Sequence, residues 1–144
     1  MKRLTASLRL LTSAFAMSLA AVPTWAQSAP APALSLELNT AQPSEKGCRL
    51  TFVVNNALGA DLSKAAFEIA LFNEAGVVDR LTVLDFKDLP AGKTKVTRFD
   101  LAGANCGKLS RVLINSATEC AGIEPAACMR ALKTSTKTAV AFGV

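Results

Sequence analysis

Four cysteines and the segment that precedes them indicate a small exported domain held together by disulfides. The first residues, "MKRLTASLR", are basic, and "LLTSAFAMSLAAV" after them is apolar, which is the pattern of a secretory signal peptide. Thr24 and Ala26 predict cleavage after Ala26, and an uncleaved N-terminal anchor is the alternative. An even number of cysteines in an exported protein indicates disulfides. We therefore expect a periplasmic or secreted protein.

The net charge and the length that matter are those of the chain without residues 1–26, the predicted signal peptide. Those residues hold three of the sixteen basic residues and none of the eleven acidic ones, which leaves thirteen against eleven and a net charge of +2. Since the remaining basic residues are dispersed, we expect no nucleic-acid partner, and no stable membrane insertion after the signal is cleaved. Residues 27–33, "QSAPAPA", are predicted to form an Ala/Pro-rich linker, and residues 34–144 one folded domain.

Short segments in which apolar and polar residues alternate recur through the predicted domain. Cys48, Leu50, Phe52 and Val54 share one face of such a segment. No long segment has a helical period, although "AACMRAL" is compatible with a single helical turn. This pattern predicts an all-β fold, a single immunoglobulin-like antiparallel β-sandwich, with an open barrel as the alternative. About seven strands are expected, at 34–40, 48–56, 65–73, 77–86, 94–101, 109–116 and 136–142.

The middle of the chain resembles the FxLYD-type family of extracytoplasmic β-sandwich domains. The matching parts are Asn55 at a strand end, "FEIALFNEAG" from Phe67, the turn "LPAG" from Leu89, and Phe99. The resemblance covers roughly half of the chain and stops before the last two strands. It implies a sandwich fold and a role as an accessory or interaction module, without a known chemistry.

Few residue types that carry chemistry are present. The sequence contains neither His nor Tyr, which excludes Ser–His and Cys–His nucleophile pairs. The cysteines form no Cys-x-x-Cys pair, which disfavours both zinc binding and thiol redox chemistry. Two facing carboxylates can act as a hydrolytic pair, but the acids beside the "LPAG" turn, Asp85, Asp88 and Asp100, stand among lysines, as on a solvated surface. We expect no catalytic, metal or cofactor residues.

The phenylalanines are divided between a predicted core and a predicted surface. Phe52, Phe67 and Phe99 fall on the faces expected to point inward, whereas Phe72 and Phe86 are expected to point outward. Two exposed phenylalanines on neighbouring strands would form an apolar patch, and such patches mark interfaces.

Charged residues on the strand from Val77 to Phe86 predict that this strand lies at a sheet edge. The charged residues on this strand are Asp79, Arg80 and Asp85, and such residues on an edge strand oppose unwanted pairing with other chains. A specific partner would bind by adding a strand to this edge. Phe72, Phe86 and Arg80 are therefore the candidate interface residues.

These observations favour a non-catalytic interaction or structural module of the cell envelope, with another envelope protein as its partner. A binder of a small apolar ligand between the two sheets is the alternative, and it requires a cavity of at least about 300 Å³.

Strand direction predicts how the cysteines pair. Counting alternating strands places Cys48 and Cys106 at one end of the sandwich and Cys120 at the other. The strand between Cys106 and Cys120 spans more than about 20 Å, whereas a disulfide needs Cα atoms within about 7 Å. The predicted pairs are Cys48–Cys106 and Cys120–Cys128, the first stabilising the fold by about 4 kcal/mol.

Peptide mapping without reduction is expected to recover both pairs, and a peptide linking Cys106 to Cys120 would contradict the assignment.

Overall fold

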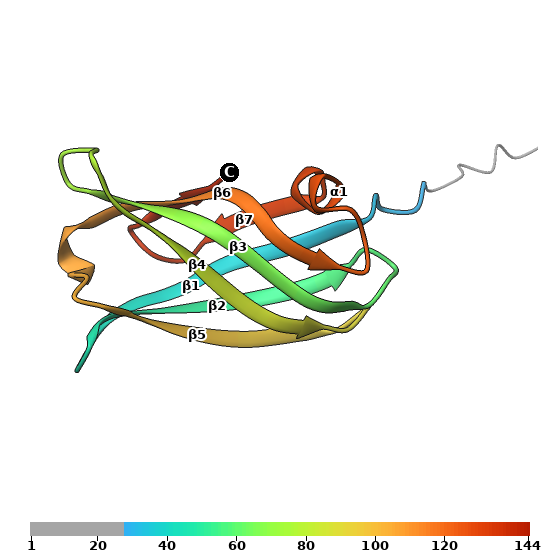
Figure 1. Cartoon of the computed structure of the whole chain (residues 1–144), viewed down its shortest axis with the longest axis horizontal. Helices are drawn as coiled ribbons and strands as arrows, with labels where there is room; N and C mark the ends of the chain where they lie inside the picture. The colour runs from blue at the N-terminus through green and yellow to red at the C-terminus, as the bar shows by residue number, and fades with distance from the viewer. Residues whose placement is uncertain (1–27) are drawn as a thin grey trace, which may run out of the picture.

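Two four-stranded sheets packed face to face make up the computed structural model, which describes residues 28–144 (Figure 1). The predicted signal peptide, residues 1–26, lies outside the described residues. The strand order is β5-β2-β1-β7 in sheet A and β4-β3-β6-β8 in sheet B. The elements are β1 (Ala33–Ser44), β2 (Gly47–Ala57), β3 (Leu62–Asn73), β4 (Val78–Leu89), β5 (Thr94–Ala102), the 3₁₀ turn η1 (Cys106–Lys108), β6 (Leu109–Ala121), α1 (Pro125–Arg130), β7 (Leu132–Thr136) and β8 (Ala141–Gly143).

The predicted all-β sandwich is confirmed, but each sheet is mixed rather than wholly antiparallel. β7 pairs in parallel with β1, and β8 pairs in parallel with β6. The single last strand expected at 136–142 is instead two short strands in different sheets. Thr136 and Thr138 stabilise the turn between these strands, because both hydroxyls lie within hydrogen-bond distance of the Val140 carbonyl, at 3.2 and 3.3 Å.

β1 also continues further than expected, through "QPS" to Ser44. Proline lacks the N–H that a central strand needs, so a break was expected there. The strand tolerates Pro43 because β7 pairs only with Leu34–Leu38 of β1. Beyond Leu38 the strand has a partner on one side alone, β2, and a missing N–H costs little at such an edge.

Edge-to-face aromatic contacts hold the two sheets together. Between ring centroids, Phe86 of β4 lies 5.6 Å from Phe52 and 5.0 Å from Phe99, both in sheet A, and 6.0 Å from Phe67 of its own sheet. The inward positions of Phe52, Phe67 and Phe99 are confirmed. The expectation that Phe86 points outward is wrong, since its side chain is only 1% exposed. Strand alternation places it on the inner face together with the buried Leu84.

Side chains fill the space between the sheets. Eight apolar side chains surround its centre and leave no room that a water molecule could enter; they are Leu36, Phe52, Phe67, Ile69, Leu84, Phe86, Ile114 and Phe142. The pocket needed by the alternative function, a small apolar ligand held between the sheets, is absent from this part of the described structure.

Both disulfides form with the predicted pairing. Cys48 in β2 is bonded to Cys106 in η1, with Cα atoms 5.0 Å apart, so sheet A is tied to the segment that leads into sheet B. Cys120 in β6 is bonded to Cys128, with Cα atoms 6.5 Å apart, and this bond holds α1 against sheet B. No cysteine among the described residues is free.

The position of Phe86 leads to a stability prediction. We expect Phe86→Ala to lower the free energy of unfolding by about 3–5 kcal/mol, because it removes a buried ring and leaves a cavity. Val96→Ala in β5 is the control, since Val96 is 58% exposed, and it should cost less than about 1 kcal/mol. Urea unfolding of both variants provides the measurement, and equal losses would contradict the central place of Phe86.

Candidate functional site

The outer surfaces of the two sheets differ in character. The outer surface of sheet A is mostly polar and carries paired charges, with Val96 of β5 as an exposed apolar residue. Arg49 in β2 donates to both carboxylate oxygens of Asp100 in β5, at 2.9 and 3.1 Å. Asn55 donates to Thr94 at 3.0 Å on the same pair of strands. A solvated outer surface of this kind is ordinary for a sandwich.

The outer surface of sheet B is apolar where an ordinary sandwich is polar. Ala70 of β3 pairs with Leu81 of β4 on one side and with Leu113 of β6 on the other, which makes an apolar row across three strands. Leu81 is 55% exposed, and Val83 beside it is 50% exposed. Ala70 is buried, although it lies outside the core cluster, because taller neighbours flank it. We call this surface the B face; its apolar residues are Ala66, Ala70, Phe72, Val78, Leu81, Val83 and Leu113.

Phe72 is the one candidate interface residue that the structure places on the B face. It is half-buried and pairs with Val78 of β4 and Arg111 of β6. The Arg111 guanidinium carbon lies 5.5 Å from the centroid of the Phe72 ring, within the range of a cation–π contact. Arg111 therefore sits directly beside the apolar row.

The three candidate interface residues do not come together. Phe86 is in the core, and Arg80 lies between the sheet edges, where its Nη1 donates to the Ala102 carbonyl of β5 at 2.7 Å. Its Nε donates to Asp79 at 3.1 Å. Arg80 thus links sheet B to sheet A.

β4 lies at the edge of sheet B, as its charged residues predicted. Lys95 of β5 reaches across to this edge, where its Nζ donates to the Asp88 carbonyl at 2.7 Å and to the Asp88 carboxylate at 3.0 Å. Near the other end of β4, the Arg80 side chain likewise reaches across to β5 and donates to the Ala102 carbonyl. A partner strand that paired with β4 along its whole length would have to displace both side chains, so the two crossings protect the edge.

The B face was missed by the sequence reasoning, although a signal for it is present. The run "LTVL" at 81–84 has apolar residues on both faces of one strand, and "RVLIN" at 111–115 does the same. A strand with one solvated face should alternate strictly. The departures from alternation at Leu81, Val83 and Leu113 are the residues that form the exposed surface.

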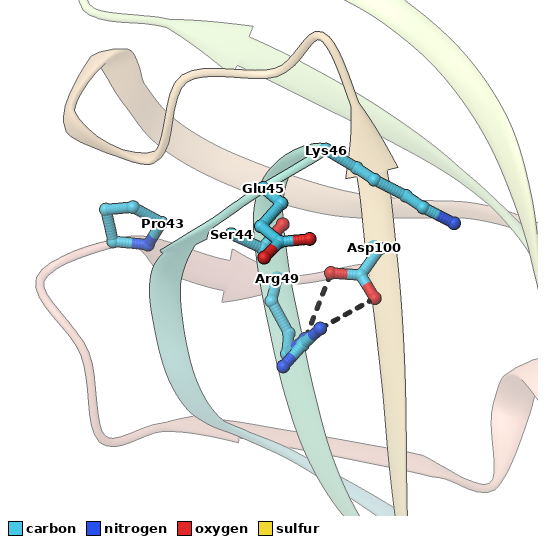
Figure 2. Close-up of a pocket in the computed structure, with 6 residues that line it drawn as sticks. All are labelled: Pro43, Ser44, Glu45, Lys46, Arg49 and Asp100. Atoms are coloured by element: carbon cyan, nitrogen blue, oxygen red, sulfur yellow. Dashed lines mark hydrogen bonds and ion pairs between the residues drawn. The ribbon is translucent and has the colours of Figure 1, made fainter.

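A polar pocket of about 630 Å³ lies beside the β1–β2 turn (Figure 2). The hydrogen bond from Arg49, more than any other cause, holds the pKa of Asp100 below its ordinary value. Asp100 in turn raises the pKa of Arg49. The two charges therefore satisfy each other. The pocket is lined by Pro43, Ser44, Glu45, Lys46, Arg49 and Asp100.

Asp85 and Asp88, two of the carboxylates considered for hydrolysis, are both bound to lysines on the surface. Asp85 lies 2.7 Å from the Lys87 ammonium, and Asp88 lies 3.0 Å from that of Lys95. These hydrogen bonds lower the pKa of both acids, whereas a general acid at neutral pH needs a raised pKa. Within residues 28–144, no three His, Cys, Asp or Glu side chains are grouped as metal ligands would be.

Comparisons with known proteins add one structural similarity. No protein-family model matches the chain, and no curated protein matches it. Among solved structures, the trimeric lipoprotein SadB of Salmonella enterica is similar, with a TM-score of 0.42 and 18% sequence identity. The similarity covers 49% of this chain and 40% of SadB, so the matched part spans about two fifths of that protein.

In the described part of the chain, no helix is both long and apolar enough to span a membrane.

The pair Arg49–Asp100 leads to a prediction about pH. The Asp100 carboxyl should titrate below about 3.9, the ordinary value for aspartate, because Arg49 stabilises the charged form. Since the folded-state pKa is the lower one, this stabilisation is present at neutral pH and is lost as the pH falls through the folded pKa. Titration of the Asp100 carboxyl carbon by NMR should show its midpoint move up in Arg49→Gln. An unchanged midpoint in that variant would contradict the assignment.

Proposed function

We propose that this chain is a non-catalytic β-sandwich protein of the periplasm that serves as an interaction or structural module of the cell envelope. The observation that carries the proposal is the B face, through which the module binds its partner. Leu81 and Val83 lie half exposed beside each other on an outer surface, where a sheet with one solvated face carries polar residues. Contiguous apolar surface of this kind marks interaction sites.

The disulfides support export to an oxidising compartment. Both disulfides join cysteines of this chain. Such bonds persist in secreted and periplasmic proteins but are rare in the cytosol. They are consistent with an extracytoplasmic location. The basic and apolar segment at residues 1–26 is the proposed export signal, and it agrees with the disulfides.

The polar side chains support a non-catalytic role. Asp85, Asp88 and Asp100 are each bound to a cation on the surface, and each has a lowered pKa. Such groups stay ionised at neutral pH and neither donate nor store protons there. The resemblance to FxLYD-type domains agrees with this role, and membership in that family is part of the proposal.

Site-specific photocrosslinking in living cells tests the proposed function. A photoreactive residue at Val83, on the B face, should give a covalent adduct with another protein chain in the envelope. The same residue at Val96, on the outer surface of sheet A, is the matched control because Val96 is 58% exposed against 50% for Val83.

The adduct at Val83 should disappear when Leu81→Lys is added, because a charge in the apolar row opposes burial of that surface. Equal adducts at Val83 and Val96, or none at either position, would contradict the role of the B face.

A further inference from the structure

Two charged residues on the B face have no oppositely charged partner within the described chain. Other acids on sheet B are paired, such as Glu119 with Lys64 at 2.6 Å and Asp85 with Lys87 at 2.7 Å. None of the ion pairs formed among residues 28–144 includes Glu68 or Arg111. Glu68 accepts a hydrogen bond from Asn115 at 2.5 Å, and Arg111 lies over Phe72.

These two charges stand on opposite sides of the apolar row. Glu68 lies two residues before Ala70 in β3, and Arg111 lies two residues before Leu113 in β6. β3 and β6 are antiparallel, and Ala70 pairs with Leu113, so the two charges lie on opposite sides of the row. Their separation along the strands is about 13 Å, four residues at roughly 3.3 Å each.

We propose that the B face binds the B face of a second copy of this chain, in a two-fold symmetric dimer. A two-fold axis that lies in the interface, along the row of Leu81, Ala70 and Leu113, brings the two charged positions opposite each other. Arg111 of each copy then meets Glu68 of the other, and the rows of Leu81, Ala70 and Leu113 pack at the centre. This inference rests on the proposed role of the B face and names its partner.

The charge pattern favours a second copy over an unrelated protein. A partner of the B face must present an acid opposite Arg111, a base opposite Glu68 and apolar surface between them. The B face itself has this arrangement, and self-complementarity is what a two-fold interface requires. Two sheets that pack face to face also form the ordinary layers of a β protein.

Contact between faces is favoured over pairing of the two β4 edges. Lys95 already donates to the carbonyl of Asp88, and Arg80 crosses from β4 to the Ala102 carbonyl. A continuous sheet made from two β4 strands would have to break both contacts. A face-to-face dimer leaves both in place, since they lie between the edges of the two sheets.

Exchange of the charges tests the dimer. Glu68→Arg alone should place two arginines together at each contact, and Arg111→Glu alone should place two acids together. Each single variant is expected to raise the dimer dissociation constant by about tenfold or more. An equimolar mixture of the two variants should form a heterodimer as tight as the wild type, because every contact is again an acid with a base.

Sedimentation velocity gives the dissociation constants, and native mass spectrometry identifies the heterodimer in the mixture. Recovery on mixing excludes misfolding as the cause of dissociation, because a misfolded chain is not repaired by a second variant. Val96→Lys on sheet A is the matched control and should leave the dimer unchanged, whereas Leu81→Lys should dissociate it.

Failure of this inference is distinguishable from failure of the proposed function. A wild-type protein that stays monomeric at every concentration, or a mixture that does not form heterodimers, overturns the second-copy proposal. If the photoreactive residue at Val83 then still gives an adduct whose mass is not twice that of this chain, the B face binds another protein and the proposed function stands.

Discussion

The edge-to-face contact between Phe52 of sheet A and Phe86 of sheet B is the interaction on which the arrangement of the molecule depends. Their centroids are 5.6 Å apart, and both rings are buried. Side chains alternate from Leu81 to Phe86, so the inward position of Phe86 fixes the sides that these residues of β4 occupy. Leu81 and Val83 are thereby placed on the outside, and the B face follows from the packing of the core.

Part of this structure was predictable because it depends on local pattern. Strand positions follow from alternation, and the disulfide pairing follows from strand direction and the span of one strand. The orientation of Phe86 was not predictable in the same way, because "LTVLDF" at 81–86 has apolar residues on both faces of the strand. Alternation cannot choose the inner face in such a run, and tertiary contact with Phe52 decides it.

The parallel strands and the contacts of Arg80 could not be predicted from the local sequence pattern. β7 and β8 each pair with a strand that is distant in sequence, and the turn between them depends on threonine hydroxyls. Arg80 was expected to face a partner, yet it bonds to a carbonyl of the other sheet. Long-range contacts of this kind are set by the packing of the sheets, which places the edges of β4 and β5 close enough for Arg80 and Lys95 to cross.

Oxidative footprinting tests most directly the claim that the B face is the binding surface. Hydroxyl radicals would be applied to the protein in isolated native envelopes and, separately, to dilute purified protein. The account predicts that Leu81, Val83 and Leu113 are oxidised more slowly in the envelope, while Val96 reacts at the same rate in both samples. Equal rates for the B-face residues in the two samples would contradict the account.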